Sequence, residues 1–102
     1  MCARILQVNF QFNASPAEYE RAMAPLAEAV AAVRGLCWKI WLQNREQCEA
    51  GGVYLFADEL SMEAYLAGPI IAGLKSHPQL RQFSLKRFDV LEDITAVTSG
   101  PI

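Results

Sequence analysis

The stretch GLCWKIWLQNREQCEAGGVYLFADE, residues 35–59, decides the fold. It holds two apolar runs, Leu36–Leu42 and Val53–Ala57, on either side of a polar connector. Both runs are rich in β-branched and aromatic residues, so the stretch predicts two adjacent strands of a hairpin. The connector, residues 43–52, is longer than a tight turn and ends in Gly51-Gly52, where the backbone can take a positive φ or form a bulge.

Working outward toward the N-terminus, residues 4–12 (RILQVNFQF) alternate strictly and predict another strand. One face is wholly apolar and comprises Leu6, Val8, Phe10 and Phe12. The other face carries Ile5, Gln7, Asn9 and Gln11. Alternation alone does not decide which face meets the helices. We expect the all-apolar face to suit a dimer interface and the Gln/Asn face to suit a helix-covered cavity.

A first helix is predicted between these strands. Ser15 is a credible N-cap, Pro16 fits the first helical position, and Glu18 completes a capping box. Pro25 predicts a kink near Ala24. The apolar stripe of this helix is Tyr19, Met23, Leu26, Val30 and Val33, and it ends at Gly35.

A second helix follows the hairpin. Asp58 or Ser61 is its predicted cap, and Gly68-Pro69 interrupts it before a short piece over residues 70–75. Residues 82–91 then predict a last strand, whose mixed alternation fits either an edge strand or a strand that lies across a subunit boundary.

The order strand, helix, strand, strand, helix, strand is that of the ferredoxin-like βαββαβ fold, in the α+β class. We expect one antiparallel sheet with the helices on one face and residues 1–102 forming a single domain. The chain is 53% hydrophobic, which is more apolar material than so short a chain easily buries. Packing two sheets face to face would cover the bare face, so we expect a homodimer that forms a dimeric α/β barrel.

Composition also argues against several function classes. Nine Lys and Arg stand against eleven Asp and Glu, with no basic cluster, so nucleic acid is not an expected partner. No apolar run approaches the roughly 18–20 residues of a membrane span, and no signal peptide is recognisable, so we expect a cytoplasmic protein. Cys2, Cys37 and Cys48 show no close pairing and fit a reduced compartment. No metal-ligand motif is present.

The segments ILQVNFQFN, APLAEAV, WKIW, EAGGVYLFADE and AYL resemble the YdhR-like family of mono-oxygenases. That family lies within a wider group of dimeric α/β-barrel proteins, which includes antibiotic-biosynthesis mono-oxygenases. The resemblance spans residues 5 to 91. It implies a homodimer, an α+β barrel and a ligand cleft between sheet and helices.

Two positions depart from the family pattern: Asn9 stands where the first strand often carries His, and Gly68-Pro69 interrupts the second helix. Haem-degrading members of the wider group use an Asn on the first strand, with a Trp and a His on or after the second helix. The nearest counterparts here are Asn9, Tyr65 and His77. Tyr65 is not Trp, and His77 lies in a proline-flanked turn off the expected spacing.

A mono-oxygenase without a cofactor must bind an aromatic phenol or enol, help to deprotonate it and exclude water. Asn9 is a candidate catalytic residue that could orient a substrate oxygen or stabilise an oxyanion. His77, the only histidine, is the candidate base. The candidate substrate-binding residues supply aromatic walls and hydrogen-bond donors, and they are Trp38, Trp41, Tyr54 and Tyr65. No cofactor and no metal are expected.

Each candidate also fits a structural role. Aromatic residues in a hairpin are often core or interface anchors. Asn9 could be a satisfied polar residue, and His77 an exposed residue of a Ser-His-Pro turn. Lys39, between two aromatic residues, could be taken for a catalytic amine, but its position favours a snorkelling side chain or an ion-pair partner.

Three functions therefore stay open. The first is a mono-oxygenase that acts on a small aromatic or polycyclic phenolic substrate. The second is a non-catalytic protein that binds a hydrophobic metabolite in the same cleft. The third, less favoured by the residues, is a haem-binding or haem-degrading relative.

Overall fold

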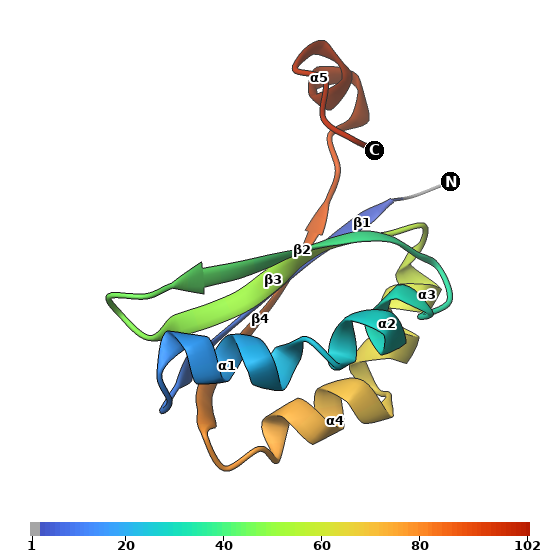
Figure 1. The fold of residues 1–102 in the computed structure, drawn as a ribbon. Helices are drawn as coiled ribbons and strands as arrows, with labels where there is room; N and C mark the ends of the chain where they lie inside the picture. Colours follow the sequence, from blue (N-terminus) through green and yellow to red (C-terminus); the bar gives the residue numbers. More distant parts are fainter. Residues whose placement is uncertain (1–2) are drawn as a thin grey trace.

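The computed structural model describes residues 3–102, and Figure 1 shows a sheet with helices α1 to α4 on one side of it. The elements in chain order are β1 (Arg4–Phe12), α1 (Pro16–Met23), α2 (Leu26–Ala31), β2 (Leu36–Asn44), β3 (Glu49–Phe56), α3 (Glu59–Leu66), α4 (Pro69–Lys75), β4 (Leu80–Asp89) and α5 (Glu92–Val97). The strand order is β2-β3-β1-β4, and every neighbouring pair is antiparallel. The fold is therefore ferredoxin-like α+β, and the predicted fold class is confirmed. β4 is an edge strand, which is one of the two positions that its mixed alternation fits.

The helix boundaries follow from local chemistry. The Ser15 hydroxyl accepts a hydrogen bond from the Glu18 N–H at 3.1 Å, and the Glu18 carboxylate accepts one from the Ser15 N–H at 3.0 Å. Pro25 separates α1 from α2 because it lacks an N–H to continue the helix. Asp58 caps α3 by accepting a hydrogen bond from the Ser61 N–H at 2.7 Å. These predicted caps and the break at Pro25 are confirmed.

The wholly apolar face of β1 packs against the helices. Its four side chains are at most 3% exposed and belong to one cluster with residues of α1, α2, α3 and α4. The ring of Tyr19 from α1 lies 6.0 Å from that of Phe10 and 4.7 Å from that of Phe12. The expectation that this face suits a dimer interface was wrong, because the helices bury its aromatic rings. The Gln/Asn face, including Asn9, is the open face of the sheet and not the wall of a helix-covered cavity.

The β2–β3 connector is shorter than predicted, spanning only residues 45–48, and Gly51-Gly52 lies inside β3. In register, Gly51 pairs with Asn9 and Gly52 with Val8 of β1. A Cβ at Gly51, where φ is 150°, would clash with the carbonyl oxygen of Val8. Gly51 therefore allows β3 to approach β1 closely, whereas a Cβ at Gly52 would meet the Lys39 side chain and the Ile40 carbonyl oxygen of β2. Neither glycine turns the chain.

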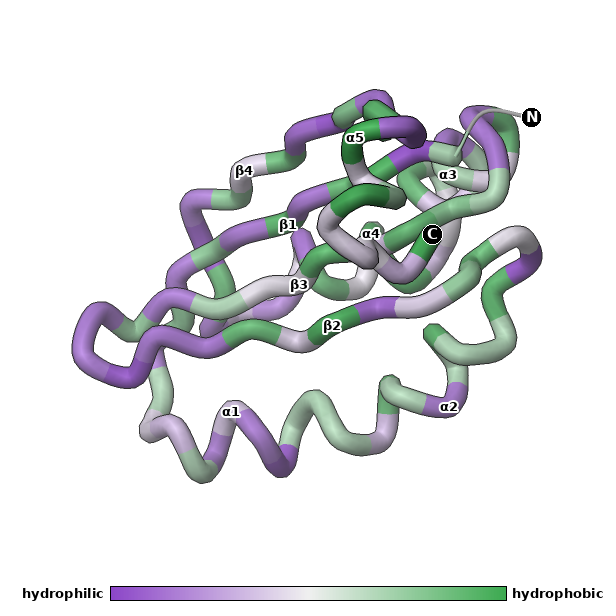
Figure 2. The backbone as a smooth tube through the Cα atoms, turned by 90° about the horizontal axis from the view of Figure 1, so that it is seen from above, coloured by the Kyte–Doolittle hydropathy of each residue, from purple (hydrophilic) through white to green (hydrophobic). Residues whose placement is uncertain are grey.

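The C-terminal segment forms α5, which the sequence did not predict. It lies across the sheet from α1 to α4 (Figure 1). Figure 2, seen from above, shows the C-terminus returning toward β2, where the indole N–H of Trp38 donates a hydrogen bond to the Pro101 carbonyl at 2.7 Å. Leu91, Ile94 and Val97 of this segment are each at least 65% exposed. The segment is thus attached at its end but leaves apolar side chains uncovered.

Candidate functional site

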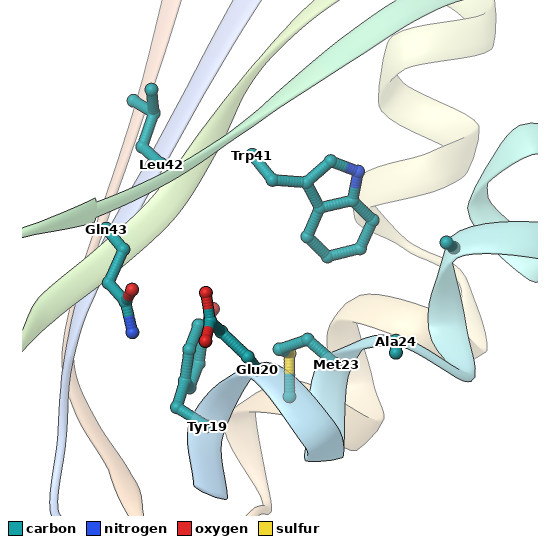
Figure 3. Close-up of a pocket in the computed structure, with 8 residues that line it drawn as sticks. Tyr19, Glu20, Met23, Ala24, Trp41, Leu42 and Gln43 are labelled. Atoms are coloured by element: carbon teal, nitrogen blue, oxygen red, sulfur yellow. The ribbon is translucent and has the colours of Figure 1, made fainter. Parts of the chain in front are cut away.

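A cleft runs between β2 and the helices α1 and α2. Its outer part has a volume of about 280 Å³ and is drawn in Figure 3. The outer part is lined by Tyr19, Glu20, Met23, Ala24, Ala27, Trp41, Leu42 and Gln43. An inner part of about 190 Å³ shares Ala27 and Trp41 with it and continues to Lys39. The two parts form one elongated site along an edge strand.

The sequence explains why this site is open. Lys39, Trp41 and Gln43 alternate along β2, so all three face the helices. Across from them α1 and α2 present small side chains at Ala24 and Ala27, which leave space. Figure 3 shows the Trp41 ring and Gln43 directed toward α1. Trp41 is 38% exposed, so the helices do not cover the ring and a ligand can contact it.

Lys39 is held between two aromatic rings. Its Nζ lies 3.3 Å from the centroid of the Trp41 ring and 4.5 Å from that of Tyr54. Burial disfavours the charged amine and lowers the pKa of Lys39 to about 7. None of the ion pairs found within residues 3–102 includes Lys39. The side chain therefore lies in an aromatic environment and is not the ion-pair partner that was one of its two interpretations.

Tyr54 and Tyr65 meet beneath this cleft in the core. Their hydroxyl oxygens are 2.8 Å apart and the two side chains are at most 5% exposed. Burial raises the pKa of Tyr54 and also that of Tyr65, so both phenols stay neutral at ordinary pH. Tyr54 contacts Lys39 from below, whereas Tyr65 lines a different groove, between α2 and α3.

The remaining predicted site residues lie elsewhere. Trp38 borders the inner part of the cleft, but its indole hydrogen-bonds to the C-terminal segment. Asn9 is on the open face, where its Nδ2 donates a hydrogen bond to Glu49 at 3.4 Å. His77 follows α4, and its Nδ1 accepts a hydrogen bond from the Gln79 N–H at 3.1 Å. It lines a separate groove between α4 and the α1–α2 pair. Catalytic roles for Asn9 and His77 stay predictions.

Sequence reasoning missed part of the lining. Tyr19 and Met23 were assigned to the core stripe of the first helix, and Glu20 and Gln43 were not considered. The usable signal was the alternation of β2: once Trp41 is placed on the helix side, Lys39 and Gln43 must share that side.

Residues 3–102 lack two kinds of feature. They contain no group of three or more His, Cys, Asp or Glu side chains arranged to hold a metal ion. No helix in this range combines the length and the apolar character needed to cross a membrane. Cys37 and Cys48 are free thiols, and Cys2 lies outside the described residues.

The family model described as "Putative mono-oxygenase ydhR" matches residues 5–101. The chain belongs to this ydhR family. No curated protein matched the chain. The predicted resemblance is therefore confirmed at the level of the family.

Solved structures share the ydhR-family fold. A protein of unknown function from Nitrosomonas europaea is 22% identical, with a TM-score of 0.77 and coverage of 89% of this chain and 91% of that one. SnoaB, a cofactor-independent oxygenase from Streptomyces nogalater, is 19% identical, with a TM-score of 0.69 and coverage of 88% and 94%. The heme-degrader MhuD from Mycobacterium tuberculosis is 24% identical, with a TM-score of 0.65 and coverage of 85% and 95%. At these identities the likeness shows the fold alone.

Proposed function

We propose that this ydhR-family protein binds a small aromatic or polycyclic phenolic molecule in the cleft between β2 and α1–α2 and oxygenates it with O₂ without a metal or flavin. The observation that carries the proposal is the exposed Trp41 ring in an elongated cleft whose other walls are largely apolar. A flat ring system can lie along such a wall, and apolar walls keep water from the reacting carbon. Membership of a mono-oxygenase family and the oxygenase SnoaB among similar folds support this reaction class.

The reaction needs little from the protein beyond binding and deprotonation. An anthrone, for example, loses a proton to give an anion that reduces O₂ directly. One oxygen atom becomes the new ring carbonyl, and the other leaves as water. The cleft would hold the anion, orient it and limit access of solvent.

The test is oxygen uptake by the purified protein with a panel of anthrones and naphthols. Trp41→Ala should lower the uptake rate about tenfold, the equivalent of losing one aromatic contact of about 1.4 kcal/mol. Leu60→Ala is the control, because Leu60 is 81% exposed on α3 and lines neither part of the cleft. An equal loss of oxygen-uptake rate in the two variants, or no oxygen uptake with any member of the panel, would contradict the proposal.

A non-catalytic binding protein is the second candidate, since the same cleft serves both functions. It predicts that the same aromatic compounds raise the melting temperature without oxygen uptake. The haem alternative receives less support. Its counterpart residues Asn9, Tyr65 and His77 lie on the open face, in the α2–α3 groove and in the α4 groove respectively, and they do not converge.

A further inference from the structure

We propose that Lys39 is the anion-binding and proton-accepting group of the cleft, and that the ligand is an acidic phenol or enol held there as its anion. This inference rests on the proposed aromatic ligand and narrows it to one chemical class. The sequence alone favours a snorkelling side chain or an ion-pair partner over a catalytic amine at Lys39, because the burial of this residue depends on the helices that pack over β2.

Position is the first argument. The outer and inner parts of the cleft meet at Ala27 and Trp41, and Lys39 lines the inner part. Its Nζ lies above the Trp41 ring, at 3.3 Å from the centroid. A flat ligand in the outer part that directs an oxygen substituent past the rim of Trp41 therefore meets the amine.

The charges around Lys39 are the second argument. The titratable groups around the two parts of the cleft are phenols, a thiol and one carboxyl. Tyr54 from β3 lies directly against the amine and is bonded to Tyr65 from α3, Cys37 from β2 lines the inner part, and Tyr19 and Glu20 from α1 line the outer part. Glu20 lies at the mouth of the cleft with its carboxylate 3.7 Å from Arg45. On the α2 side the inner part is lined by Ala27, Val30 and Ala31, none of which carries a charge. Residues 3–102 thus supply aromatic faces for the ammonium but no carboxylate within 4.0 Å of it, and a ligand oxygen can take that place.

The chemical step is one proton transfer. The phenolic O–H bond breaks, an N–H bond forms on Nζ, and an ammonium–phenolate pair results, with no change in oxidation state. Burial places the pKa of Lys39 at about 7, so a large fraction of the amine is neutral and able to accept the proton near neutral pH. The rings of Trp41 and Tyr54 then contact the ammonium that forms.

The sign of the pH dependence follows from counting protons. The bound pair holds one proton. Below pH 7 a phenol that ionises near neutrality and Lys39 together hold two, so binding must release one; above pH 7 they hold none, so binding must take one up. Affinity for such a phenol should therefore peak near pH 7 and fall on both sides.

The experiment compares 4-nitrophenol, whose anion is yellow, with its methyl ether 4-nitroanisole, which has no proton to give. The wild-type protein should bind 4-nitrophenol as the yellow anion, at least about tenfold tighter than the ether, with the peak near pH 7. Lys39→Met keeps the length and apolar stem of the side chain, and it should lose both the preference and the yellow form while still binding the ether. Lys75→Met, at the exposed end of α4, is the matched control and should behave as wild type.

A second measurement needs no variant. The three lysines are Lys39, Lys75 and Lys86, and an ordinary lysine is neutral to roughly one part in 2,500 at pH 7. Acetic anhydride at pH 7, read by peptide mass spectrometry, should acetylate Lys39 ahead of the other two, and 4-nitrophenol should protect it. Slower acetylation of Lys39 than of Lys75 would overturn the inference.

The outcomes separate the two proposals. Equal affinity of the wild-type protein for both probes, or an unchanged preference in the folded Lys39→Met variant, overturns the role of Lys39 but leaves an aromatic cleft. Binding of neither probe overturns the aromatic cleft as well.

Discussion

At the scale of single residues, Tyr54 and Tyr65 are the buried polar pair of the core, with their hydroxyl oxygens 2.8 Å apart. Tyr65→Phe removes the hydrogen-bond partner of the Tyr54 hydroxyl, and the Tyr54 side chain is only 1% exposed. We expect a loss of about 1–3 kcal/mol in the free energy of unfolding, because a buried hydroxyl without a partner keeps its desolvation cost.

The double variant Tyr54→Phe/Tyr65→Phe should be less destabilised than the sum of the two single variants, since no hydroxyl is then left unpaired. Urea unfolding of all four proteins gives the coupling energy directly. Strict additivity would show that the two hydroxyls do not depend on each other.

Sequence reasoning selected both tyrosines but not their contact. A hydrogen bond from β3 to α3 depends on how the helix docks on the sheet, and no local pattern encodes that. The same holds for Lys39. Within WKIW it resembles a snorkelling side chain, and it is the packing of α2 over β2 that buries it beside Trp41 and Tyr54.

At the scale of elements, the β1–β3 pair depends on Gly51. Gly51→Ala should lower the free energy of unfolding by about 2–5 kcal/mol, because the new Cβ would clash with the Val8 carbonyl oxygen at a strained φ of 150°. Gly73→Ala in α4 is the control: nothing lies within 4 Å of its Cβ position, and alanine favours a helix by about 0.5–1 kcal/mol. Thermal unfolding distinguishes the two, and a Gly51→Ala variant as stable as wild type would contradict the close approach.

Elements with strong local signals were predictable, and others were not. The caps at Ser15 and Asp58 and the break at Pro25 act through neighbouring backbone groups, so the sequence contains them in full. The start of β3 was misplaced because Gly51-Gly52 resembles a turn until β1 lies beside it. Helix α5 has no side-chain cap at Leu91 and spans six residues, so it carries little signal.

At the scale of the whole molecule, the open face of the sheet is apolar along the edge strand β2 and near the end of the other edge strand, β4. Ile40 is 52% exposed, Leu42 37% and Phe88 45%, and all three lie on this face. We propose that a second copy of the chain covers it, giving a homodimer that buries these side chains.

Sedimentation at micromolar concentration should show a dimer for the wild-type protein and a monomer for Ile40→Lys, because a buried lysine without a partner opposes association. Leu60→Lys is the control. Leu60 is 81% exposed on α3, among the helices and away from the open face, so this variant should stay dimeric. A wild-type monomer would contradict the dimer.

The high hydrophobic content of the chain indicated that some apolar surface would stay uncovered, but it did not indicate on which face of the sheet this surface lies. Both faces of β1 lack charged side chains between Ile5 and Phe12, so alternation could not tell the helix side from the open side. The face that carries Leu6, Val8, Phe10 and Phe12 has the larger apolar surface, and the helices bury it in the core.

The alternation of β2 has a consequence for how such proteins diverge. Lys39 and Trp41 face the cleft, while Ile40 and Leu42, set between and after them, face outward. A point substitution at a cleft-facing position such as Lys39 or Trp41 can change which ligand binds without altering the outward-facing surface formed by Ile40 and Leu42. An insertion or deletion of one residue within the strand would exchange the two sets and be purged by selection. Length variation among descendants should therefore collect in the 45–48 loop, and diversity within the strand should accumulate one position at a time.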